Sequence, residues 1–217
     1  MASHLQILGV LLALVASGYS LSCTQCTSSS DSCTGPRVTC PSGSVCGAKY
    51  REIWARGSLV SKTYKMLCLE PDMCDMKGSM SLPHHSRVKL GISCCRTDQC
   101  TPTFPSMTSD SSVSNGVICR SCMTNKSNWC YTSDTMQCTG DENMCLLETT
   151  KISGPKEASL AVRGCATKTF CDLGSLSYSI QGESVDIKFV CTSGSVGLQK
   201  GFYLPAVICI FFLKLLI

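Results

Sequence analysis

The chain has little of what most enzymes and nucleotide-binding proteins need. It contains only three histidines in 217 residues, so the pattern offers neither a serine–histidine–acid triad nor a regular set of zinc ligands. No glycine-rich loop of the phosphate-binding type is present. Between the two ends of the chain, no segment places apolar residues at helical spacing. These absences argue against an enzyme and against a helical fold, and we expect no cofactor and no bound metal.

Cysteine, in contrast, is abundant, and it follows one spacing pattern twice. Of the 19 cysteines, the first eight of one copy are separated by 3, 7, 7, 6, 22, 6 and 20 positions, and the eight of the other by 3, 8, 8, 7, 20, 6 and 20. Such repetition indicates two tandem disulfide-framed modules of about 75 to 80 residues. The two Cys-x-x-Cys motifs, Cys23–Cys26 and Cys119–Cys122, could instead bind zinc or exchange thiols, but a secreted context favours structural disulfides.

The N-terminal segment 1–20 has the features of a secretory signal peptide. An apolar stretch runs from Ile7 to Ala16, and the small residues Gly18 and Ser20 suit cleavage after Ser20. The stretch is too short to cross a bilayer as a helix. Export would place the cysteines in an oxidising compartment and would exclude nucleic acid as a partner.

The C-terminal segment 194–217 has the features of the propeptide that is exchanged for a glycosylphosphatidylinositol (GPI) anchor. Small residues around Ser193 precede a short spacer and an apolar tail that begins at Phe202. A membrane-spanning helix needs about 20 apolar residues, and Pro205 and Lys214 count against one. We expect attachment at Ser193, with Gly194 as the alternative residue. The other interpretations are a short transmembrane segment and an unprocessed secreted tail.

Removal of both ends would leave a chain that can form disulfides throughout. Cys209 would leave with the tail, so 18 cysteines would remain, enough for nine bridges. Small extracellular domains need such bridges because their cores are thin, and each bridge that closes about twenty residues contributes ~3 kcal/mol. We expect the mature protein on the outer face of the plasma membrane or, without an anchor, in the medium.

Between the cysteines, short segments alternate apolar and polar residues, which predicts half-buried strands. The segments with this pattern are 87–93, 176–180 and 185–189. Turn signals that divide the chain into hairpins stand at 56–58, 153–155 and 181–183. We therefore predict an all-β, disulfide-rich fold of two modules, joined by an extended linker over 102–118.

Three hairpins that leave a cysteine cluster, opened by Cys-x-x-Cys and closed by Cys94-Cys95-x4-Cys100, resemble the lymphocyte antigen 6/urokinase-receptor superfamily. The resemblance implies a three-finger (snake-toxin-like) domain over 21–101 with five disulfides and another over 119–193 with four. The second domain lacks the closing element, and Thr101 stands where the family has asparagine. The pairs implied by the resemblance are Cys23–Cys46, Cys26–Cys33, Cys40–Cys68, Cys74–Cys94, Cys95–Cys100, Cys119–Cys145, Cys122–Cys130, Cys138–Cys165 and Cys171–Cys191.

Within this superfamily the chain resembles the two-domain phospholipase A2 inhibitors of the gamma type. The segments that carry this resemblance are 21–26, 39–43, 46–47, 115–116, 138–142 and 163–167. It implies a non-enzymatic protein whose rigid fingers present a surface to an extracellular protein. We expect a GPI-anchored protein of the ligand or receptor kind. The alternatives are a secreted inhibitor of phospholipase A2 and a pheromone-like secreted signal.

The second finger of the first domain concentrates basic and aromatic side chains, the types that anchor protein interfaces. Residues 21–100 carry ten Lys or Arg against six Asp or Glu, whereas residues 119–192 carry seven against eight. We predict that this finger contacts an acidic protein or a sulfated glycan, although an ordinary solvated hairpin would show the same pattern. The predicted contact residues are Arg51, Trp54, Arg56, Lys62 and Tyr64.

Two loops carry further features. Asn125-Lys126-Ser127 is an N-glycosylation sequon, and we expect a glycan on Asn125. His84 and His85 follow Pro83 at the expected tip of the third finger. They could form a pH-sensitive contact or a weak metal site, but we favour two solvated loop residues.

Overall fold

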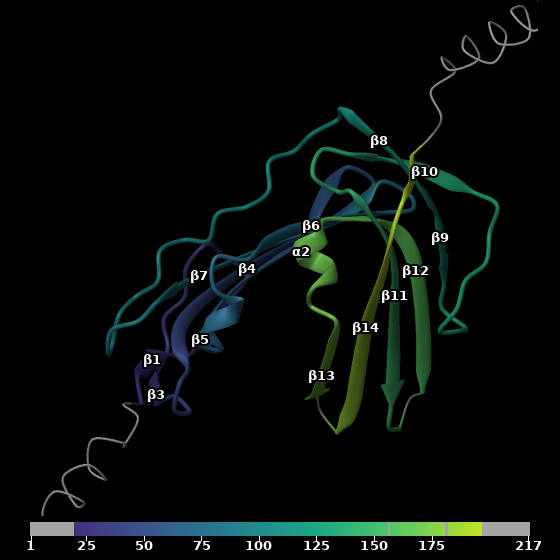
Figure 1. Ribbon diagram of the computed structural model, residues 1–217. Helices are drawn as coiled ribbons and strands as arrows, with labels where there is room; N and C mark the ends of the chain where they lie inside the picture. The colour runs from purple at the N-terminus through teal and green to yellow at the C-terminus, as the bar shows by residue number, and fades with distance from the viewer. Residues whose placement is uncertain (1–19, 156, 181, 197–217) are drawn as a thin grey trace, which may run out of the picture. The chain divides into compact units, whose positions relative to one another are not determined.

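The computed structural model describes residues 20–155, 157–180 and 182–196. The predicted signal peptide up to residue 19 and the predicted propeptide from residue 197 lie outside the described residues. Within the described ranges, no helix is both long and apolar enough to cross a membrane. The chain divides between Asp110 and Ser111 into two compact units, here the first and second modules (Figure 1).

The first module contains an antiparallel sheet with the strand order β2–β5–β4–β7–β6 and a small separate pair, β1–β3. Strands β4 and β5 form its longest hairpin, which corresponds to the predicted second finger. The elements are β1 (Ser22–Thr24), β2 (Cys26–Ser28), β3 (Arg37–Thr39), β4 (Val45–Ala55), β5 (Ser58–Leu69), the 3-10 helix η1 (Pro71–Met73), β6 (Lys77–Leu82) and β7 (Ser86–Cys95).

The second module repeats this arrangement with the strand order β9–β12–β11–β14–β13, accompanied by a small sheet β10–β8–β15. Its elements are β8 (Ser114–Arg120), β9 (Cys122–Thr124), β10 (Thr135–Thr139), β11 (Met144–Ser153), β12 (Ala158–Ala166), α2 (Lys168–Cys171), β13 (Ser175–Ile180), β14 (Glu183–Ser193) and β15 (Ser195–Val196).

The prediction of a disulfide-rich, nearly all-β chain is confirmed, and the three alternating segments fall within β7, β13 and β14. Helix α2 was not predicted. It is a single turn, too short to produce a helical pattern, and it begins after Thr167, whose hydroxyl accepts a hydrogen bond from the backbone N–H of Phe170.

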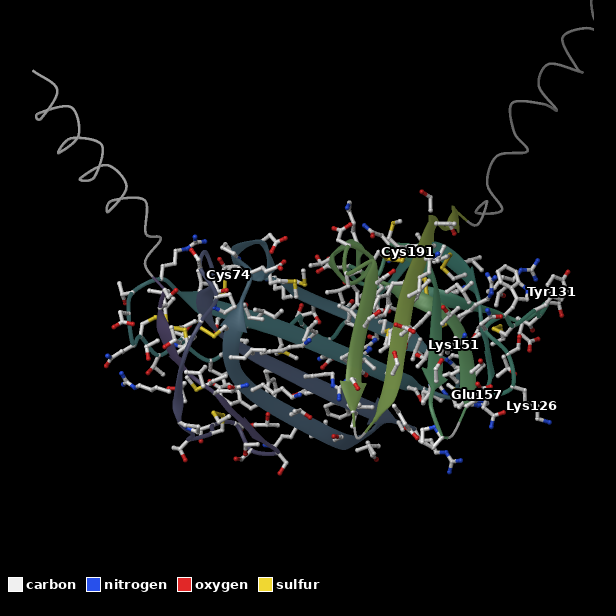
Figure 2. The ribbon with its side chains drawn as sticks, turned by 90° about the horizontal axis from the view of Figure 1, so that it is seen from below. Cys74, Lys126, Tyr131, Lys151, Glu157 and Cys191 are labelled. Carbon is white, nitrogen blue, oxygen red and sulfur yellow. A yellow bond between two sulfur atoms is a disulfide. The ribbon has the colours of Figure 1, made fainter. Side chains whose placement is uncertain are left out.

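Among the described residues, nine disulfides connect the strands and the loops beside them. The sulfur atoms of Cys23, Cys40 and Cys68 lie within 4.8 Å of one another, so neighbouring bridges pack together and form much of the core. The second module repeats this cluster with Cys119, Cys138 and Cys165. The bridges are Cys23–Cys46, Cys26–Cys33, Cys40–Cys68, Cys74–Cys94, Cys95–Cys100, Cys119–Cys145, Cys122–Cys130, Cys138–Cys165 and Cys171–Cys191, with Cys74 and Cys191 labelled in Figure 2.

Residues 103–110, the first part of the predicted linker, lie against one face of the first module's sheet. The ring of Phe104 lies 4.7 Å from that of Tyr50 and stacks on that of Tyr64 at 5.9 Å, between ring centroids. A side chain at Gly91 would place its Cβ 2.5 Å from the carbonyl oxygen of Ser106, so this close approach requires glycine. The segment is therefore part of the first module's packing.

Asp110 fixes the far end of this segment by two ion pairs. Its carboxylate lies 2.7 Å from a guanidinium nitrogen of Arg87 and 2.7 Å from the ammonium of Lys89, which is buried. The hydrogen bond from Lys89 lowers the pKa of Asp110 below its ordinary value of 3.8, and Arg87 lowers it further. The segment thus crosses from the two tyrosines of β4 and β5 to the basic side chains of β7.

Two hairpin tips of the first module have consecutive residues with positive φ, the backbone of a type I′ turn. Arg56 and Gly57, with φ of 52° and 78°, connect β4 to β5. His84 and His85, with φ of 59° and 54°, connect β6 to β7, and both are exposed. The histidines thus have a structural explanation as exposed turn residues.

Candidate functional site

The predicted contact residues of the second finger lie in three different environments: the tip of the hairpin, its surface and the core. Arg51 and Arg56 are exposed, and Arg56 occupies the turn. Trp54 is half-buried, and its indole N–H donates a hydrogen bond of 3.0 Å to the carboxylate of Glu52. Lys62 is engaged in an ion pair of 2.7 Å with Asp31, whose pKa it lowers.

Tyr64 belongs to the core, which corrects its predicted role in partner contact. It is 5% exposed and packs in a cluster with Ala48, Tyr50 and Met66. Burial raises the pKa of Tyr64, as expected for a phenol removed from water. A buried ring that is stacked on Phe104 cannot also contact a partner at the surface, so the prediction of Tyr64 as a contact residue is wrong.

The same hairpin carries three cations whose charges are not neutralised by an ion pair. Lys49 on β4 lies directly across from Lys65 on β5, and Arg51 follows Lys49 on the same face of the strand. Burial lowers the pKa of Lys49, and the charges of Arg51 and Lys65 lower it further. Within the described ranges none of the three forms an ion pair. We call Lys49, Arg51 and Lys65 the basic row.

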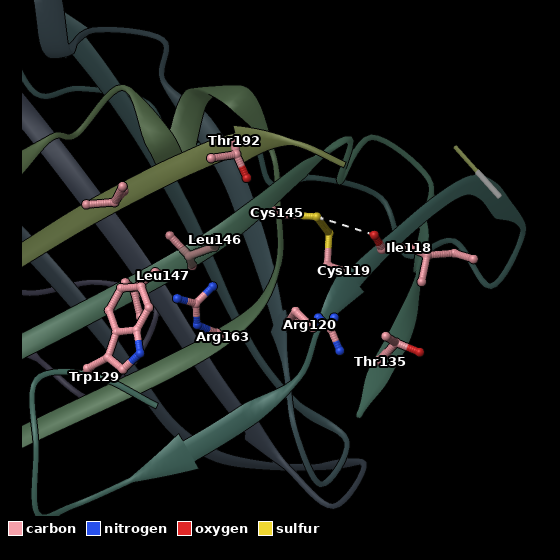
Figure 3. Close-up of a pocket in the computed structure, with 11 residues that line it drawn as sticks. Ile118, Cys119, Arg120, Trp129, Thr135, Cys145, Leu146, Leu147, Arg163 and Thr192 are labelled. Carbon is pink, nitrogen blue, oxygen red and sulfur yellow. Dashed lines mark hydrogen bonds between the residues drawn. A yellow bond between two sulfur atoms is a disulfide. The ribbon is translucent and has the colours of Figure 1, made fainter. Parts of the chain in front are cut away.

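The second module contains a pocket of about 500 Å3, shown in Figure 3. Its floor is a row of side chains across three strands, Arg163 on β12, Leu147 on β11 and Val190 on β14. Its walls are Trp129, from the loop between β9 and β10, together with the end of β8 and the start of β10. The residues that line it are Ile118, Cys119, Arg120, Trp129, Thr135, Cys145, Leu146, Leu147, Arg163, Val190 and Thr192.

Two arginines and a tryptophan give this pocket its chemistry. The guanidinium carbon of Arg163 lies 4.4 Å from the ring centroid of Trp129, a cation–π contact, and its Nε donates a 3.1 Å hydrogen bond to the carbonyl of Cys130. Arg120 donates from Nη1 to the carbonyl of Thr132 at 3.1 Å. Arg163 is therefore held by two contacts and Arg120 by one, and both side chains line the pocket.

The pocket combines the side chains that dominate protein interfaces. Trp129 is 56% exposed and Val190 is 41% exposed, although both are large and apolar. Tryptophan and arginine are the residues most enriched among energetically important interface positions. A concave, mostly apolar surface with a few directed polar groups is the usual form of a binding site.

A family model describes both modules. The model of the u-PAR/Ly-6 domain matches residues 19–103 and, a second time, residues 115–197. The chain belongs to the u-PAR/Ly-6 domain family. The superfamily inferred from the cysteine pattern is thereby confirmed.

Similar u-PAR/Ly-6 proteins include inhibitors and a receptor. Phospholipase A2 inhibitor NAI of Notechis ater is 29% identical over 185 residues, which cover 82% of this chain and 90% of the inhibitor. The phospholipase A2 inhibitor 25 kDa subunit of Naja kaouthia is 28% identical over 176 residues, 79% of this chain and 94% of the subunit. The urokinase plasminogen activator surface receptor of Aotus trivirgatus is 33% identical over 98 residues, 44% of this chain and 29% of the receptor. The crystal structure of mouse TEX101 aligns with 78% of this chain and 97% of its own, at 18% identity and a TM-score of 0.31.

The predicted modification sites of this u-PAR/Ly-6 chain are exposed. Asn125 lies in the β9–β10 loop, from which Lys126 and Tyr131 project outward in Figure 2. Ser193 is the last residue of β14. The exposure of both side chains is compatible with the two modifications, which stay predictions.

Sequence reasoning missed the pocket. The cysteine pattern gives no reason to single out Arg120, Arg163 or Trp129. One signal was available, since Trp129 is one of only two tryptophans and directly precedes a cysteine of the repeat. The pairing of Arg163 with Leu147 and Val190 depends on strand register, which the spacing of cysteines alone does not determine.

Proposed function

We propose that this u-PAR/Ly-6 protein is a non-enzymatic binding molecule of the cell surface, held on the outer leaflet by a GPI anchor at Ser193 and recognising an acidic extracellular protein. The basic row carries the proposal. Two like charges directly across a sheet lower the stability of the fold. A negatively charged partner would be attracted by such a row, and this gives a functional reason for cations at these positions. The named relatives are inhibitors and a receptor, which supports binding in place of catalysis.

The structure changes the set of contact residues that the proposal uses. Arg51, Arg56 and Trp54 stay in it, and Lys49 and Lys65 join them. Tyr64 leaves because it is buried, and Lys62 contributes less because its charge is paired with Asp31. The surface therefore runs along the basic row to the tip of the finger.

Charge substitutions in the finger test the partner surface. Arg51→Glu combined with Lys65→Glu should weaken binding of a captured extracellular partner at least tenfold, measured by surface plasmon resonance with the mature protein. Arg56→Asn removes the tip charge while asparagine suits the positive φ of the turn, so a loss there is not a folding defect. Lys188→Glu, an exposed change in the second module, is the control. Unchanged binding by the double variant would refute this surface. If dextran sulfate competes for the surface and acidic proteins do not, the ligand is a sulfated glycan.

Enzymatic release tests the anchor. Phosphatidylinositol-specific phospholipase C should release the protein from intact cells, and Ser193→Pro should reduce the amount at the surface. Protein that is found only in the medium, with none released by the enzyme, would contradict the anchor and favour a secreted inhibitor or a secreted signal.

A second candidate function is inhibition of secreted phospholipase A2. The observation in its favour is the similarity over nearly the whole length of two proteins named as such inhibitors. Purified mature protein added to secreted phospholipase A2 acting on phosphatidylcholine vesicles distinguishes the two. Stoichiometric inhibition would establish this candidate, and full activity at a large excess of the protein would exclude it.

A further inference from the structure

Each module has a row of three side chains on neighbouring strands at the equivalent register position. In each sheet this row lies two residues along the strands from a row that contains bridged cysteines. In the first module, Ala48, Met66 and Ser93 lie side by side, next to the row Cys46, Cys68 and Cys95. In the second module, Leu147, Arg163 and Val190 lie side by side, next to the row Cys145, Cys165 and Thr192. The floor of the pocket is thus the counterpart of a row that is buried in the first module.

The first module covers this row with its own chain. The hydroxyl of Ser93 donates a hydrogen bond to the carbonyl of Thr103, and Met107 packs against the cluster that contains Ala48 and Met66. All three members of the row are at most 9% exposed. In the second module, Val190 is 41% exposed and the pocket lies over the row.

The covering segment shows which kind of chain fits such a face. Residues 103–110 carry two large apolar side chains, Phe104 and Met107, which pack on the sheet. They end in an acidic residue, Asp110, whose carboxylate pairs with Arg87 and Lys89. Apolar contact and a carboxylate–cation pair thus occur together in one segment.

The second module offers matching groups without an occupant among the described residues. Leu147, Val190 and Trp129 supply the apolar surface, and no Asp or Glu lines the pocket. Arg163 is held by Trp129 and by the carbonyl of Cys130, and its two terminal nitrogens have no partner in the described part of the chain. A guanidinium held in this way can bind a carboxylate through two parallel hydrogen bonds and loses little further side-chain entropy.

We propose that this pocket binds an extended segment of a partner protein in which a bulky apolar residue stands next to an acidic one. The apolar side chain packs on Leu147, Val190 and Trp129, as Phe104 and Met107 pack on the first module. The carboxylate pairs with Arg163, and Arg120 lies within the same pocket. The inference rests on the proposed function as a protein-binding molecule, but it concerns a surface on the other module.

Two capped dipeptides that differ only in charge test the proposal. Acetyl-Glu-Phe-amide and acetyl-Gln-Phe-amide are titrated into the mature protein, purified from animal cells and carrying Trp54→Phe, which leaves Trp129 as the only tryptophan. The Glu peptide should change Trp129 fluorescence saturably, with a dissociation constant on the order of 1 mM, the level expected of a single filled pocket. The Gln peptide should bind at least tenfold more weakly.

Three variants connect the effect to the arginine. Arg163→Gln should abolish the preference for Glu over Gln, and Arg163→Lys, which keeps the charge but loses the fork, should retain only part of it. Lys151→Gln removes an exposed cation from the same module outside the pocket and should change nothing. An unchanged near-ultraviolet circular dichroism spectrum verifies that each variant is folded.

The outcomes separate this inference from the proposed function. Equal binding of the two peptides, or no saturable change in Trp129 fluorescence, overturns the pocket assignment. In that case, loss of partner binding on charge reversal in the basic row would still support the proposed function. Tighter binding of hexanoate, which has the same carboxylate and an apolar chain, would assign the pocket to a small amphiphile and overturn a protein segment as the ligand. Peptide binding that depends on Arg163 supports the pocket whether or not the basic row contacts a partner.

Discussion

The two modules have the same strand order but differ in what covers equivalent faces of their sheets. In the first, residues 103–110 return over the sheet and bury Tyr50, Tyr64 and the row beside them. In the second, the equivalent row is the floor of a pocket with an exposed tryptophan at its side. A disulfide-framed sheet therefore leaves this face undecided. In the first module a following segment makes it core, whereas among the described residues of the second module it borders a pocket.

The largest expected effect comes from matched disulfides. Cys74–Cys94 and Cys171–Cys191 both have a sequence separation of 20, so loss of either removes ~3 kcal/mol in the chain-entropy model. After Cys74→Ala/Cys94→Ala, the first module still has Cys95–Cys100 and its covering segment. After Cys171→Ala/Cys191→Ala, strands β13 and β14 have neither among the residues that the structure describes. Hydrogen exchange should show the greater loss of protection in β13–β14, and equal losses would contradict the comparison.

Phe104→Ala should make the first module resemble the second. Loss of the ring contacts with Tyr50 and Tyr64 should lower the free energy of unfolding by about 1–2 kcal/mol, measured by urea denaturation. Burial, with the carboxylates of Asp31 and Glu52, raises the pKa of Tyr50 to about 12, and ultraviolet titration should show a lower value in the variant. Val113→Ala, at a residue that is 74% exposed, is the control and should change neither quantity.

A smaller effect should follow the charge of Asp110. Because Lys89 and Arg87 lower its pKa below 3.8, its contribution to stability is complete above that pH and is lost as the pH falls through the lowered value. Asp110 is well exposed, so the contribution is on the order of 0.5–1 kcal/mol. Asp110→Asn should show this loss already at pH 7 and should flatten the acid limb of the stability curve. An unchanged acid limb would exclude Asp110 as its source.

The smallest effect has the opposite sign. Lys49→Met removes one of two cations that face each other across β4 and β5, and it should raise the free energy of unfolding by about 0.2–0.5 kcal/mol. Lys77→Met, an exposed change on β6, should leave it nearly constant. Destabilisation by Lys49→Met would show that the basic row is not under mutual repulsion.

The sequence allowed prediction of those features that depend on local pattern. Alternation located β7, β13 and β14, and the cysteine repeat indicated two modules. Prediction from the sequence failed for Tyr64. A tyrosine in a basic hairpin resembles an interface residue, and the ring that packs against it, Phe104, comes 40 positions later in the chain. The pocket could not be predicted because it joins β8, β11, β12 and β14 with the β9–β10 loop, and only three-dimensional register brings these together.

If the proposed anchor is attached at Ser193, the bridge Cys171–Cys191 determines how a pulling force acts on the second module. Only two positions separate the proposed lipid attachment from a cysteine whose partner lies at the end of helix α2. A pulling force between a bound partner and the membrane would act along β14 and would reach the disulfide after two residues. We expect the second module to resist extension in single-molecule pulling from its C-terminus, and Cys171→Ala/Cys191→Ala should abolish the resistance.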